Sequence, residues 1–308
     1  MQPGSAPGCV VSPEGFSVRI AVLGSQGQLG RDLLSTLRGE IVPLTRLHID
    51  LANPVTIAPG VAEVKADVLV NCAAYNFVDK AETDSAEAFA INAIGVRDLA
   101  KACAANGTKL VQISTDFVFG LDETRTAPLT ESTSPGPVSA YGVSKLAGEQ
   151  FALAAHSGNL VIRTCGLYGI WGSGGKGGNF VETMLRIAGQ GKPLRVVSDQ
   201  RCTPSFTVDV AMAIADLIDA KAVGIVHATN ADCCTWHEFA TEIFKLAGLA
   251  VDVAPITSAQ FNAPARRPLY SVLSTDRLVS LGIARPRPWR DALENYLKER
   301  RVTNALPR

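Results

Sequence analysis

The stretch that decides the fold is VRIAVLGSQGQLG, residues 18–30. It begins as a short apolar run rich in β-branched residues, which indicates a strand, and continues into a segment with helical spacing at 28–39. Gly24, Gly27 and Gly30 therefore fall at a strand-to-helix junction. Glycines there permit a tight turn, close approach to a pyrophosphate and close helix packing, and the helix N-terminus offers free N–H groups. The stretch predicts a dinucleotide-binding fold, although its GxxGxxG spacing alone would also suit a plain turn.

Apolar strands alternate with helical patterns through the rest of the first half. We expect strands at 41–45, 66–74, 109–115 and 159–164, a long helix at 85–107, and another helix beginning near Tyr141. Pro43 favours an edge position for the strand at 41–45. This order predicts an α/β fold of the Rossmann type, with a doubly wound parallel sheet covered on both faces.

The character of the chain changes after Thr164. A glycine-rich loop at 166–180 is followed by helical patterns at 180–190, 207–220 and 235–248, and IVHAT (225–229) reads as one more strand of the main sheet. We therefore expect a smaller C-terminal α/β substrate lobe made from separate segments. The predicted division is an N-terminal extension at 1–16, a dinucleotide-binding domain at 17–164 with 207–229 returning to it, and a substrate-binding lobe at 165–206 and 230–308.

Composition narrows the class of protein. The chain has 308 residues, 47% of them hydrophobic, and no net charge, which suits two globular lobes and gives no basic surface for nucleic acid. No apolar run reaches the roughly 18 residues of a transmembrane helix. The seven cysteines are scattered without CxxC spacing, so neither a disulfide framework nor a zinc site or other metal site is indicated. We expect a cytoplasmic protein.

The second strand bears on the choice of cofactor. It ends in Leu44-Thr45-Arg46, where an acidic residue would hydrogen-bond the ribose 2′-hydroxyl of NAD. A hydroxyl and a guanidinium suit the 2′-phosphate of NADPH instead. Asp50 lies twenty residues after Gly30, a spacing that also fits NADH. We predict a preference for NADPH.

Tyr141 and Lys145 stand four residues apart in SAYGVSK (139–145), on one face of the expected helix. Such a pair alone most often lies on a solvated surface. In a dinucleotide-binding fold it has a chemical use, because a carbonyl that receives a hydride also needs a proton. The phenol can donate that proton, and a nearby ammonium is expected to lower the pKa of the phenol.

The fourth strand ends in QISTDFVFG (112–120), and ligands of open parallel sheets gather at the carboxyl ends of strands. Ser114, Thr115 and Asp116 are therefore candidates, with a hydroxyl that could hold the substrate oxygen for the phenol. Guanidinium groups suit phosphate, so Arg201, Arg266 and Arg267 are candidates for clamping a sugar diphosphate.

Taken together, these motifs resemble the extended short-chain dehydrogenase/reductase family, and within it the dTDP-4-dehydrorhamnose reductases. The likeness runs from about Arg19 to Lys298. Its further markers are DLANP (50–54), VNCAAYNFVDKAE (70–82), STDFVFG (114–120), YGVSKLAGE (141–149), GGNFVETMLR (177–186), SDQRCTPS (198–205), TWHEFA (235–240) and RPLYSVLST (267–275).

The resemblance implies a set of functional residues and an activity. It implies NADPH-dependent reduction of the C4 ketone of a nucleotide-activated 4-keto-6-deoxy sugar, such as dTDP-4-dehydrorhamnose, by a homodimer. The implied catalytic residues are Thr115, Tyr141 and Lys145. The cofactor-binding residues that it implies are Gly24, Gln28, Leu29, Asp50, Leu51, Ala73, Ala74, Tyr75, Asn92, Tyr141 and Lys145, to which the glycine turn and the second strand add Gly27, Gly30 and Arg46. The implied substrate-binding residues are Asp116, Phe117, Asn179, Gln200, Arg201 and Arg267.

This chain differs from the family at two positions where the sugar is expected to bind. Relatives usually have tyrosine where this chain has Phe117, and tryptophan where it has Gly166. These changes leave open which sugar is reduced and on which face. Two other functions fit the same fold: a non-catalytic regulatory subunit that binds NADP, and a nucleotide-sugar epimerase that holds NAD tightly. The intact Thr115, Tyr141 and Lys145 favour the reductase.

Overall fold

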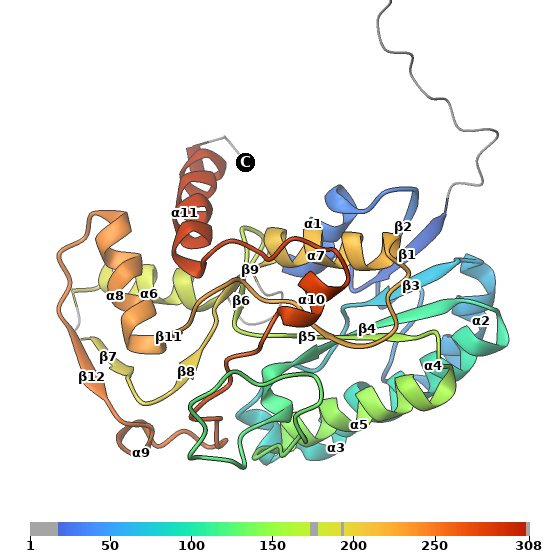
Figure 1. The fold of residues 1–308 in the computed structure, drawn as a ribbon, viewed down its shortest axis with the longest axis horizontal. Coiled ribbons are helices and arrows are strands. Elements are labelled where there is room, and N and C mark those ends of the chain that lie inside the picture. The colour runs from blue at the N-terminus through green and yellow to red at the C-terminus, as the bar shows by residue number, and fades with distance from the viewer. Residues whose placement is uncertain (1–17, 173–177, 192–193, 306–308) are drawn as a thin grey trace, which may run out of the picture.

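The computed structural model describes residues 18–172, 178–191 and 194–305. Its centre is a six-stranded, all-parallel sheet (Figure 1). The strands lie in the order β10 (Gly224–His227), β5 (Leu160–Thr164), β4 (Lys109–Thr115), β3 (Val68–Asn71), β1 (Arg19–Leu23) and β2 (Glu40–Leu44). The strand with Pro43 is at the edge, as predicted, because proline has no N–H for a second neighbour.

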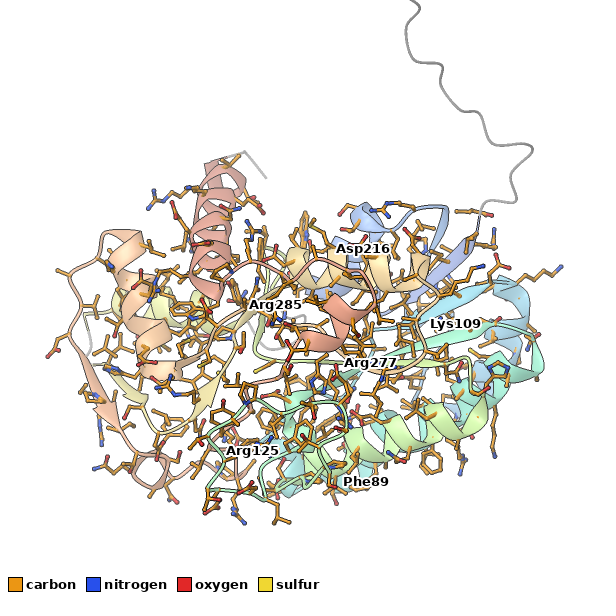
Figure 2. All side chains as sticks on the ribbon, in the orientation of Figure 1. Phe89, Lys109, Arg125, Asp216, Arg277 and Arg285 are labelled. Atoms are coloured by element: carbon orange, nitrogen blue, oxygen red, sulfur yellow. The ribbon has the colours of Figure 1, made fainter. Side chains whose placement is uncertain are left out.

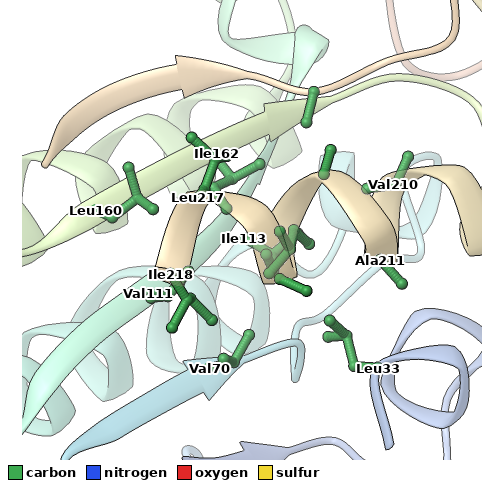
Figure 3. Packing of buried hydrophobic residues seen from close by; sticks show 14 of the residues in the cluster. Leu33, Val70, Val111, Ile113, Leu160, Ile162, Val210, Ala211, Leu217 and Ile218 are labelled. Carbon is green, nitrogen blue, oxygen red and sulfur yellow. The ribbon is translucent and has the colours of Figure 1, made fainter. Parts of the chain in front are cut away.

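Two helical layers cover the sheet because alternate residues of each buried strand face opposite sides. Ile20 and Val22 pack with α1 (Gln28–Thr36), α7 (Thr207–Asp219) and α10 (Asp276–Ser280). Figure 3 shows α7 lying across Val70, Val111 and Ile162 of three successive strands. Ala21 and Leu23 pack instead with α2 (Pro54–Val64), α4 (Val96–Ala105) and α5 (Ala140–Ala155). The doubly wound α/β architecture is confirmed.

Two helical features differ from the predictions. The helix expected at 85–107 consists of α3 (Ser85–Phe89), a π-helical turn η2 (Ala90–Gly95) and α4. The backbone is tightly confined at this turn, since a Cβ on Gly148 would lie 2.2 Å from the Asn92 carbonyl oxygen. Helix α2 was not predicted, because Pro59 in its interior obscures the helical pattern.

The smaller lobe is assembled from short paired strands and three longer helices around one core (Figure 1). Tyr168, Phe206, Phe239 and Tyr296 are central to this core. Its strand pairs are β7 (Leu194–Val197) with β12 (Val253–Ile256), β8 (Arg201–Cys202) with β11 (Cys234–Thr235), and β6 (Leu167–Tyr168) with β9 (Ser205–Phe206). Its helices are α6 (Phe180–Ala188), α8 (Trp236–Ala247), α9 (Ser258–Phe261) and α11 (Trp289–Ala305).

We propose that the domain boundaries follow the predicted division, except that α10 and Ile283, which were predicted for the substrate-binding lobe, pack in the core of the main sheet. Two contacts support it: β10 pairs with β5 of the main sheet, and α7 packs against α1. The predicted extension at 1–16 and residues 173–177 of the glycine-rich loop lie outside the described residues.

The sheet is oriented with the carboxyl ends of its strands toward the smaller lobe. Figure 2 labels Lys109, the first residue of β4, at the side of the sheet away from that lobe, and Arg125, after the end of β4, nearer to it. A short 3-10 turn, η3 (Asp116–Val118), follows β4, and another, η1 (Lys80–Glu82), follows β3. None of the helices in the described segments is both long enough and apolar enough to cross a membrane.

Candidate active site

The glycine turn between β1 and α1 has the predicted close contacts. Gly24 has φ +81°, and a Cβ there would lie 2.8 Å from the backbone nitrogen of Ala73. A Cβ on Gly30 would lie 2.3 Å from the Gly24 carbonyl oxygen, so both positions require glycine. Gly27 is the N-cap of α1 and supplies no side-chain cap. The first N–H groups of α1 are left free for an anion, which fits a dinucleotide pyrophosphate.

A cavity of about 1000 Å³ runs from this turn to the carboxyl ends of β4 and β5. Most of the predicted site residues line it, from the main sheet, from α5 and from the smaller lobe. They are Gly24, Gly27, Gln28, Leu29, Gly30, Arg46, Asp50, Leu51, Ala73, Ala74, Thr115, Asp116, Phe117, Tyr141, Lys145, Asn179 and Arg267. The same cavity thus joins the residues predicted for cofactor, catalysis and substrate.

Tyr141 and Lys145 lie on the first turns of α5, whose N-cap is Ser139. The Ser139 hydroxyl caps the helix by accepting the N–H of Gly142 at 3.2 Å. Both side chains are buried at the wall of the cavity, with 8% and 5% of their surface exposed. The Lys145 ammonium donates to the carbonyl oxygen of Ile113 at 2.7 Å, which ties α5 to the end of β4. The predicted pair is therefore a fixed feature of the cavity and not a solvated surface pair.

The predicted direction of the Tyr141 pKa is wrong. Burial raises the pKa of the phenol well above its usual value, a hydrogen bond with Thr115 opposes this, and the nearby Asp116 carboxyl adds to the rise. Burial also lowers the pKa of Lys145 to about 8, although the Glu149 carboxylate favours its charged form. Loss of hydration is the largest cause at both groups: it outweighs the Thr115 hydrogen bond at Tyr141 and the attraction of the Glu149 carboxylate at Lys145. Tyr141 is consequently protonated at neutral pH, the state that a proton donor needs.

Thr115 and Asp116 stand at the end of β4, beside Tyr141. The Thr115 hydroxyl donates to Asp116 Oδ1 at 3.1 Å and accepts the N–H of Phe117 at 3.2 Å. Asp116 is 4% exposed. Its Oδ2 accepts from Ser271 at 2.6 Å and from the Cys165 thiol at 3.1 Å. Sequence reasoning did not find Ser271, since it lies 155 residues from its partner and no spacing signal connects them.

The two positions that depart from the family lie on the same cavity. The Phe117 ring meets the Tyr141 ring edge to face, with centroids 5.5 Å apart. Gly166 has φ +53°, and a Cβ there would lie 3.2 Å from the Trp236 ring. Trp236 in turn packs on Phe180, a residue of the cavity wall, with centroids 4.8 Å apart. Trp236 of the smaller lobe, which packs on Phe180, therefore lies beside the position that lacks a side chain.

Arg267 reaches the cavity and is held by an ion pair. Its guanidinium contacts Asp79 Oδ2 at 2.9 Å, and both residues line the cavity. The sequence did not indicate this ion pair, because Asp79 and Arg267 are 188 residues apart. The neighbouring Arg266 turns elsewhere and contacts Glu123 at 2.7 Å. Of this adjacent pair, Arg267 is the arginine that lines the cavity.

Besides Arg266, four other predicted residues do not line the cavity. The Asn92 amide accepts the N–H of Tyr75 at 2.9 Å and donates to the Tyr75 carbonyl and to Ser144, each at 3.0 Å. Asn92 and Tyr75 thus brace the wall behind Ala74. Gln200 donates to Ser258 at 2.9 Å. Arg201 contacts the Cys233 sulfur at 3.7 Å and Glu238 at 3.8 Å.

Comparison with known proteins places this site in a family. Residues 18–302 match the family described as RmlD substrate binding domain. The chain is 39% identical to dTDP-4-dehydrorhamnose reductase of Mycolicibacterium smegmatis, over 90% of this chain and 84% of that protein. It is 41% identical to a probable dTDP-4,6-dihydroxy-2-methyloxan-3-one 4-ketoreductase of Streptomyces antibioticus, over 90% of this chain and 93% of that one.

A solved structure gives the same result. The dTDP-4-dehydrorhamnose reductase of Bacillus anthracis in complex with NADP is 36% identical to this chain, with a TM-score of 0.86 over 92% of this chain and 100% of that one. The chain belongs to the RmlD substrate binding domain family, the family of the dTDP-4-dehydrorhamnose reductases.

Proposed function

We propose that this protein uses NADPH to reduce the C4 ketone of a dTDP-linked 4-keto-6-deoxy sugar, with dTDP-4-dehydrorhamnose as the first candidate. The observation that carries the proposal is the single cavity that joins the glycine turn to Thr115, Tyr141 and Lys145. The activities of the relatives, and the NADP in the Bacillus anthracis structure, support the same reaction.

The chemistry assigns a role to each residue of the triad. Bound NADPH supplies the hydride, and the reduced carbonyl oxygen then needs a proton. Tyr141 donates it, since burial keeps the phenol protonated at neutral pH. The Lys145 ammonium, fixed on the Ile113 carbonyl, supplies positive charge beside the developing phenolate. Thr115 contacts the phenol and holds its orientation.

Turnover with a defined product tests the proposal. The purified protein is mixed with NADPH and dTDP-4-dehydrorhamnose, NADPH consumption is followed, and the C4 configuration of the product is determined by proton NMR. We expect turnover to a single C4 epimer. Binding of NADPH without consumption, across a panel of dTDP-4-ketosugars, would instead favour the regulatory subunit.

Arg46 is proposed to select NADPH. It lines the cavity with an 80% exposed side chain, and its Nε lies 4.0 Å from Asp50 Oδ1. Asp50 Oδ1 is itself used within its own turn, where it accepts the N–H of Ala52 at 3.0 Å. The guanidinium is therefore the group available to a 2′-phosphate.

Arg46→Ala is expected to raise the KM for NADPH about tenfold or more, because a hydrogen bond to a charged group contributes about 1.5–3 kcal/mol. The KM for NADH should change little. Steady-state kinetics with both cofactors measure this, and Arg38→Ala is the matched control, as Arg38 pairs with Asp219 on α7. Equal losses with both cofactors would contradict the assignment.

Arg267 is proposed to bind the diphosphate of the substrate. Arg267→Ala should raise the KM for the nucleotide sugar about tenfold or more and leave the KM for NADPH nearly unchanged. Arg266→Ala is the control, because its neighbouring guanidinium contacts Glu123 and does not line the cavity. If both variants raised the two KM values alike, the assignment of Arg267 to the diphosphate would be wrong.

We also propose a homodimer and a cytoplasmic location. The homodimer is proposed by analogy with the family. The cytoplasmic location is supported by the six cysteines of the described residues, all of which are free thiols. Light scattering of the purified protein tests the first, and fractionation of cells tests the second.

A further inference from the structure

The first turn of α5 carries Tyr141, and side chains from outside the helix bind two of its N–H groups. The first four N–H groups of a helix have no partner within the helix. The N-cap Ser139 accepts the N–H of Gly142 at 3.2 Å. The N–H of Ala140, directly before Tyr141, donates to Glu82 Oε1 at 2.8 Å. This second cap comes from a residue 58 positions earlier in the chain.

Glu82 also brings a negative charge that the sequence of α5 does not provide. Residues 140–143, the first turn of the helix, contain no acidic side chain. A carboxylate is favoured at a helix N-terminus because the free N–H groups there carry partial positive charge. A hydrogen bond that a carboxylate accepts is also roughly twice as strong as one between neutral groups. The contact between Glu82 and Ala140 is therefore suited to fixing the start of α5.

The start of α5 has to be placed accurately because it lies tightly against the end of β4. A Cβ on Gly142 would lie 2.3 Å from the carbonyl oxygen of Phe117 in η3. A shift of this turn would therefore also shift the Tyr141 phenol relative to Thr115 and the cavity. A displacement of about 1 Å in a reacting group can lower a rate about 10²-fold.

The short segment that carries Glu82 is itself anchored, and it holds a second part of the site. Ala81 in η1 is 0% exposed and belongs to the core under the helix layer of α5. Asp79, the N-cap of η1, accepts the N–H of Ala265 at 3.2 Å and the Arg267 guanidinium at 2.9 Å. One anchored segment thus bonds both to the helix of Tyr141 and to the segment of Arg267.

We propose that Glu82 is a positioning residue, whose carboxylate fixes the start of α5 and so holds the Tyr141 phenol at the cavity. Of the described residues, those that line the cavity do not include Glu82, so it acts through the helix and not on a ligand. Asp79, on the same segment, fixes the backbone that carries Arg267. The inference rests on the proposed function for its effect on turnover, and goes beyond it by giving a residue outside the cavity control of the proton donor.

Hydrogen–deuterium exchange of the free protein, read by mass spectrometry, tests the contact itself. Glu82→Ala is expected to speed exchange about fivefold or more in the peptide that covers residues 139–146, because a helix cap is lost. The peptide that covers residues 263–269 should be unchanged, and Asp79→Ala should give the reverse pattern. No change at 139–146 in Glu82→Ala, or an equal change in both peptides, would overturn the proposal. The measurement needs no substrate, so its result holds whether or not a ketosugar is turned over.

Single-turnover oxidation of NADPH by the ketosugar tests the consequence for Tyr141. The rate should fall about tenfold or more in Glu82→Ala. Glu82→Gln keeps an oxygen that can accept the N–H of Ala140, so its rate should stay within about threefold of native. Glu87→Ala is the control for loss of charge and should keep the native rate, since Glu87 is an exposed acid of α3 that pairs with Lys80.

Two kinetic results would overturn the positioning role. One is a native rate in Glu82→Ala, and the other is a loss in Glu82→Gln as large as that in Glu82→Ala. If the native protein oxidises no NADPH with any ketosugar, the proposed function fails, and the exchange measurement alone decides whether Glu82 fixes the start of α5.

Discussion

Tyr141→Phe is expected to lower kcat for ketosugar reduction by about 10²–10⁴-fold, the usual contribution of a positioned general acid. The phenyl ring keeps the edge-to-face contact with Phe117, so the wall of the cavity should be preserved. The KM for NADPH should change little, because the lost hydroxyl acts on the transferred proton. Single-turnover measurement of NADPH oxidation reports the chemical step directly.

The control is Tyr168→Phe. Tyr168 is fully buried in the core of the smaller lobe, and its hydroxyl has no hydrogen-bond partner among the described residues. The same chemical change at that position should leave kcat within about twofold of native, since no group of the cavity is touched. If Tyr141→Phe retained near-native turnover, Tyr141 would not be the acid and the proposed mechanism would fail.

The fold could be predicted from local signals. The apolar run at 18–24 ends in Gly24, whose positive φ favours glycine, and Gly30 lies against the carbonyl oxygen of Gly24. The spacing of these glycines in the sequence was therefore enough to predict the turn. Strands buried on both faces read as continuous apolar runs, which identified the parallel sheet. Such features can be predicted from the sequence because the residues that define them lie close together along the chain.

The electrostatics of the site could not be predicted in the same way. The spacing of Tyr141 and Lys145 revealed the pair but not its burial, and burial reversed the expected direction of the Tyr141 pKa. Asp116 with Ser271, and Arg267 with Asp79, are partners separated by more than 150 residues. Such contacts depend on how the two lobes meet, and no local period encodes that.

Arg163→Met is expected to lower the free energy of unfolding by about 3–5 kcal/mol, the usual cost of breaking a buried ion pair from one side. Arg163 and Glu149 are 1% and 0% exposed and form two hydrogen bonds, at 2.9 and 2.7 Å. Methionine is similar in length, so little cavity is created, but the Glu149 carboxylate keeps only the hydrogen bond from Ser114 at 2.5 Å. Urea unfolding, with the slope compared between variants, measures the loss.

A second substitution can separate two causes of this destabilisation, the uncompensated charge of Glu149 and the lost packing of the Arg163 side chain. Glu149→Leu in the Arg163→Met background removes the buried charge that the single variant leaves without its cation. If uncompensated charge is the main cost, the double variant should be more stable than Arg163→Met and recover about half or more of the lost free energy. If the double variant is as unstable as the sum of the two single variants, the packing of the long side chains, and not their charge, supports this end of β5.

Because Glu149 lies one helical turn beyond Lys145 and favours its charged form, the same double variant should also lower the pKa of the Lys145 ammonium below about 8. The fall of activity at high pH would then begin at a lower pH than in the native protein, which links the stability of the buried pair to the charge that the catalytic step uses.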